Sequence, residues 1–263
     1  MRVVTDHIIA ETSSKGNQEK WLENGRWYKL DQFGYEALAE TVISKLLEKC
    51  RFDSKFSFVK YDIEKIIVHN RPRIACVSNN FLKDRHSIIT INKLISNEIG
   101  EPLVKRLAPI SSNIKRLEYM VDTVSGITGL KSFGEYLTLI FEIDTLFLNE
   151  DRHLNNIAVL YDGSGFEYCP IFDNGAGLLS DVRSYGYDIA PQGLYPLVKA
   201  QPFGMSFTRQ ANAMRKLYGR QLKTAFDMND VDYVLDEAVT FYPERDRGLI
   251  RDRVRYCIKK GHS

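Results

Sequence analysis

Alternation of apolar and polar residues, broken by turns, marks the first third of the chain. The clearest feature is Asn24-Gly25, a dipeptide typical of tight hairpins, between two short β-type runs. Residues 35–49 differ, because their apolar side chains recur at helical spacing among good helix formers. The pattern predicts a small antiparallel sheet with one main helix. The expected strands cover residues 3–10, 20–23, 26–30, 56–61, 65–69 and 73–78.

The remainder of the chain is mostly helical in pattern. Its basic end, residues 245–260, is interpreted as the solvated face of a helix rather than as a nucleic-acid-binding helix. No internal repeat and no low-complexity segment interrupts it. Apolar residues at helical spacing recur in 91–99, 114–123, 132–148, 209–217 and 231–241.

The stretch 147–175 carries the candidate chemistry. Asp151 is followed five positions later by Asn156, and Asp173 lies in a later apolar run. Phosphoryl transfer needs a carboxylate beside the attacking hydroxyl and hard oxygen ligands for Mg²⁺, and these residues supply one base and two ligands. Two β-type runs around the turn 162–165 predict a hairpin that brings Asn156 and Asp173 side by side. Alone, the D-x-x-x-x-N spacing also fits a polar loop between buried elements.

The N-terminal third supplies the other parts of such a site. Lys29 ends the second hairpin strand and is expected to contact the phosphates of ATP, although a lysine lying along a strand edge also fits. Glu36 and Glu40 lie one turn apart on the predicted helix, so either could orient Lys29. We favour Glu40, because a residue one turn inside the helix is held more rigidly. The strand that contains Cys76 leads into residues 78–82, which suit a hinge whose backbone pairs with adenine.

These parts, in this order, predict an α+β, two-lobed protein-kinase-like fold. The N-lobe, residues 1–82, would hold the small antiparallel β-sheet and one main helix and would end at the hinge. The mostly helical C-lobe, residues 83–263, would hold the catalytic loop and the metal-binding Asp173. Within it, residues 178–202 would fit an activation or substrate-binding segment.

Composition adds few constraints. Among 263 residues, 44% are hydrophobic and 36 Lys and Arg balance 34 Asp and Glu, so the charge does not demand a nucleic acid or a membrane as partner. Four scattered cysteines without C-x-x-C spacing indicate buried free thiols in a reducing compartment. There is neither a membrane-spanning apolar run nor a signal-peptide pattern at the N-terminus. We therefore expect a cytoplasmic protein, with secretion left open.

Several motifs in order make the chain resemble the HipA-like bacterial Ser/Thr kinases, in a short form without the N-terminal subdomain. The catalytic-loop match, N-x-D-x-H-x-N-N, is the most specific of them. The match differs at Asn155, where the family usually has Lys. The positive charge of that lysine is therefore expected either to be lacking in this protein or to be supplied by Arg152. The matching segments are Ser13-x-x-Gly16-x-Gln18-Glu19-Lys20, Trp27-Tyr28-Lys29, residues 149–156, and Pro170-Ile171-Phe172-Asp173.

The resemblance implies ATP and Mg²⁺ as cofactors and gives residues their roles. Asp151 would be the base, and His153 would support the catalytic loop. Lys29 would contact the phosphates, and Glu40 would orient Lys29. Ser13 matches a site of inactivating autophosphorylation. An unidentified protein substrate and a small helix-turn-helix antitoxin are the implied partners. The residues expected to bind the nucleotide and its metal are Ser13, Gly16, Asn17, Gln18, Lys20, Lys29, Cys76, Asn156 and Asp173.

Two other functions use the same residues. Asp151-Arg152-His153-x-x-Asn156 is also the D-R-H-x-x-N of phosphoinositide kinases, but residues 178–202 carry no dense basic cluster to face a membrane. A pseudokinase that only binds nucleotide is disfavoured, because every catalytic residue type is present. The sequence therefore predicts an ATP-dependent protein Ser/Thr kinase, and the family resemblance implies that it could be of the toxin type and could phosphorylate itself.

Overall fold

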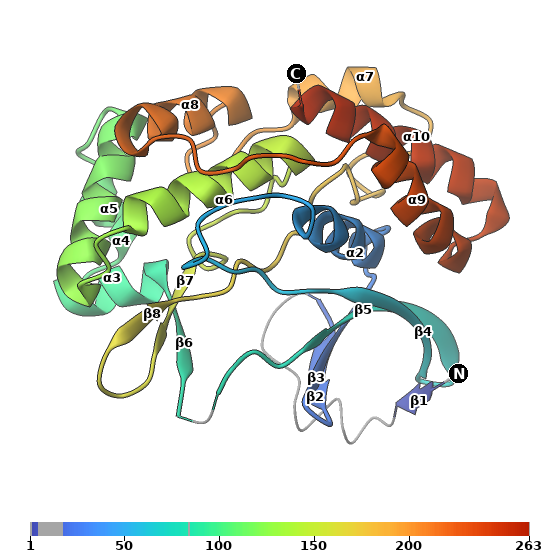
Figure 1. Ribbon diagram of the computed structural model, residues 1–263, viewed down its shortest axis with the longest axis horizontal. Coiled ribbons are helices and arrows are strands. Elements are labelled where there is room, and N and C mark those ends of the chain that lie inside the picture. Colours follow the sequence, from blue (N-terminus) through green and yellow to red (C-terminus); the bar gives the residue numbers. More distant parts are fainter. Residues whose placement is uncertain (1, 5–17, 84, 263) are drawn as a thin grey trace.

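The computed structural model describes residues 2–4, 18–83 and 85–262, and it has the predicted two-lobed, kinase-like α+β architecture (Figure 1). One lobe is a twisted sheet with the helix α2 (Glu36–Leu47), and the other is mainly helical. The predictions for Ser13, Gly16 and Asn17 lie outside the described residues. Among the described residues, no helix is long and apolar enough to cross a bilayer.

The N-lobe sheet has five strands in the spatial order β1-β4-β5-β3-β2. All neighbours are antiparallel except β1 and β4, which run parallel. Asn24 and Gly25 join β2 to β3, and both have positive φ, as a tight hairpin requires. His69 and Asn70 do the same between β4 and β5. The bounds are β1 Arg2–Val4, β2 Lys20–Glu23, β3 Arg26–Leu30, β4 Asp62–Val68 and β5 Arg71–Asn79.

The two faces of this sheet have different neighbours. Since side chains alternate along a strand, Tyr28 and Leu30 point to one face, where they join a small separate apolar cluster. Lys29 points to the other face, and its partner across the β3–β5 ladder is Cys76. That second face lies against α2. The alternation of side chains along β3 therefore places Lys29 between the sheet and the helix.

Helix α2 lies between the sheet and the C-terminal helices (Figure 1). Every residue of it except Lys45 is buried. Its partner on the far side is α9 (Met228–Ala238), which in turn packs against α10 (Glu244–Gly261). The main apolar core is therefore continuous from the sheet through α2 into the C-lobe.

The C-lobe is built around α6 (Phe133–Phe147), the broad apolar helix predicted from the sequence. Leu148 ends it in a left-handed conformation and turns the chain into the catalytic loop. A second sheet, β6-β7-β8, contains the predicted hairpin around residues 162–165. The remaining bounds are β6 Ser87–Thr90, β7 Ala158–Tyr161, β8 Phe166–Tyr168, α3 Ile91–Ile99, α4 Leu103–Leu107, α5 Asn113–Thr128, α7 Pro191–Leu194, η1 Tyr195–Leu197, α8 Phe207–Tyr218 and η2 Val239–Phe241.

Some expected elements are wrong or incomplete. Residues 56–61 form no strand; only Phe58 makes a bridge, to Ile171, while Phe56 and Val59 bury in the main core. Strand β8 stops at Tyr168 because Pro170, two residues later, cannot donate a ladder hydrogen bond. The sequence pattern also did not predict β6, whose partner β7 lies about seventy residues further along the chain.

A buried carboxyl group joins the two lobes next to α2. Asp31 Oδ1 accepts a hydrogen bond from the backbone N–H of Ala37 at 2.6 Å, in the first turn of α2. Its Oδ2 accepts one from the Tyr242 hydroxyl at 2.6 Å, from the C-lobe. Burial raises the pKa of Asp31 to about 8, although both hydrogen bonds favour the charged form.

This raised pKa predicts a pH-dependent stability. Between pH of about 4 and about 8 the folded protein holds a proton on Asp31 that the unfolded chain has released, so stability falls as pH rises through that range. One proton is worth about 1.4 kcal/mol per pH unit at most. In urea unfolding at several pH values, wild type should lose stability as pH rises from about 4 to about 8. The variant Asp31→Asn should not show this loss, because its side chain cannot ionise. Parallel profiles for the two proteins would contradict the assignment.

Candidate active site

A buried lysine joins three separate parts of the chain. Lys29 Nζ lies 2.6 Å from Glu40 Oε1 on α2 and 2.6 Å from Asp173 Oδ1, which follows β8. The other oxygen of Glu40 accepts the backbone N–H of Asn174 at 2.9 Å. Sheet, helix and the Asp173 segment are thus fixed to one another through a single ammonium group.

The charges in this group support each other. Burial alone would lower the pKa of Lys29, but the carboxylates of Asp173 and Glu40 outweigh it and raise that pKa well above its usual value. Burial would likewise raise the pKa of Asp173, yet the ammonium of Lys29 holds it at about 2. Both groups are therefore ionised at neutral pH.

Glu36 and Glu40, left as alternatives by the sequence, have different places. Glu40 meets Lys29, whereas the Glu36 carboxylate accepts the backbone N–H groups of Phe33 at 2.6 Å and Gly34 at 3.0 Å. Glu36 thus closes the chain turn that leads into α2. It still reaches the wall of the cavity described below.

The catalytic loop holds its polar groups by hydrogen bonds within the loop. The Asn156 side-chain amide donates to the Asp151 carbonyl at 2.9 Å, and Asn149 Oδ1 accepts the Asp151 backbone N–H at 3.3 Å. Asn149 Nδ2 also donates to the Asp173 carbonyl at 3.3 Å. These hydrogen bonds hold the catalytic loop next to the Asp173 segment, which is the arrangement that the predicted hairpin requires.

Asp151 presents its carboxylate to the cavity. Its side chain is 58% exposed, and partial burial raises its pKa. His153 Nε2 lies 3.8 Å from Asp151 Oδ2, and the His153 backbone N–H donates to the Asp151 carbonyl at 2.8 Å. His153 was expected to support the catalytic loop, and its imidazole lies beside the carboxylate on the cavity wall.

Of the two alternatives for the positive charge missing at Asn155, replacement by Arg152 is disfavoured. Its side chain is fully buried and forms an ion pair with Asp144 of α6 at 3.0 Å. It also donates to the carbonyls of Asn156 and Phe172 at 3.1 and 2.6 Å. With this many partners inside the lobe, Arg152 supports the loop from behind.

A cavity of about 750 Å³ opens in front of these groups. Gln18 and Lys20 lie on its N-lobe side; Gln18 Nε2 donates to the Leu30 carbonyl at 2.7 Å. Burial and the neighbouring Lys29 lower the pKa of Lys20, while Asp173 opposes that shift. Cys76 is buried beside Lys29 and is absent from the described lining. The other lining residues are Gln32, Phe33, Glu36, Glu150, Asp151, His153, Asn155, Asn156, Asp173, Gly175, Ala176, Ser180, Asp181, Ser184 and Tyr185.

The segment after the Asp173 region closes one side of the cavity. Tyr35 N–H donates to the Ser180 carbonyl at 3.2 Å, and a Cβ on Gly34 would lie 2.0 Å from that carbonyl, so only glycine allows this approach. Further along, the Tyr185 hydroxyl donates to Glu150, next to Asp151. The buried Arg253 of α10 donates to the Tyr185 carbonyl at 2.5 Å.

The oxygen donors at the cavity fit a hard cation such as Mg²⁺. Asp173 is ionised, and the Asn156 amide is oriented through its nitrogen, which leaves its oxygen as a ligand. Sequence reasoning named Asn149 only as the first position of the catalytic-loop match and missed the other residues that support these donors. Asp144 is a buried polar residue within an apolar run, a signal that could have been read, whereas nothing local marks Tyr185 or Arg253.

The buried network predicts that Arg152→Leu is strongly destabilising. The substitution leaves Asp144 buried without its counter-charge, which costs about 3–5 kcal/mol. Chemical unfolding measures the difference, with the exposed Arg220→Leu as the matched control. Near-normal stability with an altered KM for a substrate would instead return Arg152 to the substrate side.

The helix pair Glu40 and Glu36 gives a matched comparison. Glu40→Gln removes one of two carboxylates from a buried ammonium and should cost about 1–3 kcal/mol of stability. It should also weaken nucleotide binding, because Lys29 loses its support from α2. Glu36→Gln should leave nucleotide affinity nearly unchanged, since its carboxylate meets backbone groups. Equal losses of affinity in the two variants would contradict the distinction.

No protein-family model matches the chain, and no curated protein sequence does. Solved structures do match. The proinflammatory kinase CtkA of Helicobacter pylori is 16% identical over 95% of this chain and 91% of its own, with a TM-score of 0.60. HipA of Shewanella oneidensis, solved with HipB and its operator DNA, is 13% identical, with a TM-score of 0.51; the match covers 96% of this chain and 65% of that one. The fold of this chain is the fold of the HipA-like kinases.

Proposed function

We propose that the protein is an ATP-dependent protein Ser/Thr kinase. The observation that carries the proposal is the convergence on one cavity of Asp151, Asn156 and Asp173, with Asp173 paired to Lys29 and, through it, to Glu40. Proton acceptor, oxygen ligands and phosphate-binding cation are the parts that phosphoryl transfer requires. The fold shared with CtkA and HipA supports the same reading.

Each residue has a role in this proposal. Lys29, held by Glu40, meets the phosphates of ATP, and Lys20 and Gln18 add donors from the N-lobe side of the cavity. The loop residues Ser13, Gly16 and Asn17 are proposed to cover the phosphates. Asn156 and Asp173 would hold Mg²⁺, which, when bound, neutralises charge on the phosphate oxygens.

Asp151 is the proposed proton acceptor. Its half-exposed carboxylate can reach a hydroxyl that enters the open side of the cavity. The acceptor oxygen attacks the γ-phosphorus, the bond to the β-phosphate oxygen breaks, and the hydroxyl proton passes to Asp151. His153, 3.8 Å away, would orient that carboxylate.

The two structural neighbours come from different settings. One is described as a proinflammatory kinase, and the other is solved with HipB and operator DNA. By analogy with HipB, a small antitoxin is a candidate partner of this chain. The proposal rests on the chemistry of the cavity.

The direct test is mass spectrometry of the purified protein after incubation with Mg²⁺ and ATP. Wild type should acquire phosphate on Ser13 or a neighbouring Ser or Thr. Asp151→Asn should lose at least about 100-fold of this activity, because the proton acceptor is gone. It should still bind ATP, since the phosphate-binding side is unchanged.

Asp122→Asn, an exposed position on α5, is the matched control and should react like wild type. No phosphate in any of the proteins, with ATP bound, would contradict the protein-kinase assignment. It would point instead to a lipid or small-molecule acceptor or to a nucleotide-binding module.

A further inference from the structure

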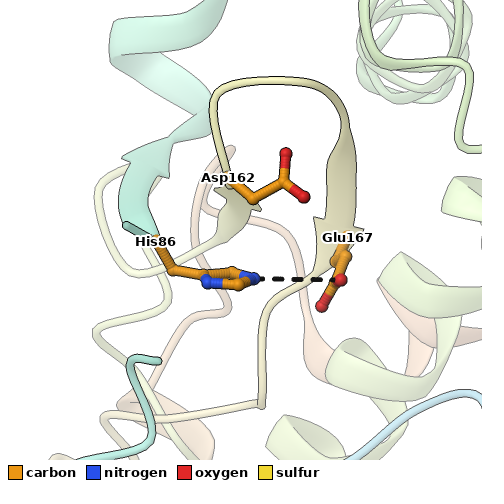
Figure 2. A group of neighbouring side chains, drawn as sticks. All are labelled: His86, Asp162 and Glu167. Atoms are coloured by element: carbon orange, nitrogen blue, oxygen red, sulfur yellow. Dashed lines mark ion pairs between the residues drawn. The ribbon is translucent and has the colours of Figure 1, made fainter. Parts of the chain in front are cut away.

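Three metal-ligating side chains meet at the closed end of the β7–β8 hairpin. His86 lies just before β6, Asp162 begins the hairpin turn, and Glu167 lies on β8. Figure 2 shows the imidazole reaching from the β6 side towards the two carboxylates. One ligand atom from each residue lies within 4.8 Å of the other two. The catalytic residues Asn156 and Asp173 flank the opposite, open end of this hairpin.

The three side chains differ in how firmly they are held. The His86 side chain is only 11% exposed, so its position is set by packing. Asp162 Oδ1 accepts the backbone N–H groups of Ser164 and Gly165 at 2.8 Å each, which fixes the carboxylate and leaves its second oxygen available. Glu167 is 53% exposed and can adjust. Two preorganised ligands and one adaptable ligand suit capture of an ion from solution.

The distances are close to those of a tetrahedral site. His86 Nε2 and Glu167 Oε1 are 3.8 Å apart. Ligand atoms about 2.1 Å from a tetrahedral ion lie about 3.4 Å from one another. The ligand atoms of the three side chains must therefore approach one another by at most about 1.4 Å. Rotation of the exposed Glu167 side chain supplies movement of that size.

The charges also call for a cation. Hydrogen bonds from the turn lower the pKa of Asp162 to about 2, so it is ionised at neutral pH. Over the part of the chain that the structure describes, neither Asp162 nor Glu167 pairs with a Lys or an Arg. The basic group that faces both carboxylates is the His86 imidazole, and a bound cation would further offset the repulsion between them.

We propose that His86, Asp162 and Glu167 bind a divalent transition-metal ion of the Zn²⁺ class, with water completing the coordination. One imidazole and two carboxylates suit Zn²⁺, whereas Mg²⁺ prefers oxygen ligands alone. The ion would join β6 to the β7–β8 hairpin at the end remote from the cavity. Its role would be structural, because it lies away from Asp151.

The test is calorimetric titration of the metal-stripped, full-length protein with Zn²⁺. Excess Mg²⁺ in the buffer occupies the proposed magnesium ligands, Asn156 and Asp173. The variant Asp173→Asn shows whether Zn²⁺ binds at those ligands instead. Wild type should bind one Zn²⁺ and Asp173→Asn should retain it. Glu167→Gln should weaken binding by about 100-fold or more, since losing a direct ligand costs at least as much as losing a supporting partner.

Glu167→Gln alters an exposed side chain and is expected to fold; a thermal melt checks this. His86→Gln should abolish the same binding event and the rise in melting temperature that Zn²⁺ gives wild type. The proposal is overturned if wild type binds no Zn²⁺, which would leave a plain ion pair between His86 and Glu167. It is equally overturned if His86→Gln and Glu167→Gln bind Zn²⁺ as wild type does.

Discussion

The buried ammonium of Lys29 is the constraint on which the rest of this structure depends. A charge under a helix is tolerated only if opposite charges meet it, and here they come from α2 and from the segment after β8. The sheet, the helix and the metal-ligand segment must therefore take one relative position. The same contacts ionise Asp173 and keep Lys29 charged, so the electrostatics of the cavity follow from the packing.

Arg152 is a second buried cation with the same logic in the C-lobe. It pairs with Asp144 on α6 and donates to two carbonyls that flank the β7–β8 hairpin in the chain, that of Asn156 before β7 and that of Phe172 after β8. One cation thus fixes the cavity from the N-lobe side and the other from behind the catalytic loop. The groups that face the cavity are few, and most of the polar residues around them hold the backbone in place.

Local signals in the sequence were enough for much of this. Asn24-Gly25 predicted the hairpin, with Lys29 at the end of its second strand. Helical spacing left Glu36 and Glu40 as candidate partners of Lys29, and the favoured Glu40 is the one that meets it. Partnerships across the chain were beyond such signals. Residues 56–61 have strand-like composition, but Phe56, Val59 and Tyr61 bury individually in the core. Arg152 was a candidate for the cavity because its pairing with Asp144 of α6 is a contact between separate elements. Tertiary contacts decided both cases.

The burial of α2 on two sides limits how the molecule can move. In a two-lobed enzyme that opens by rotation about a hinge, the helix of the smaller lobe must slide or part from its neighbours. Here one apolar core runs from the sheet through α2 into α9 and α10, and separation would expose that core to water. Rotation of one lobe against the other would therefore carry the free-energy cost of exposing this core, and the two lobes are held together as a single body.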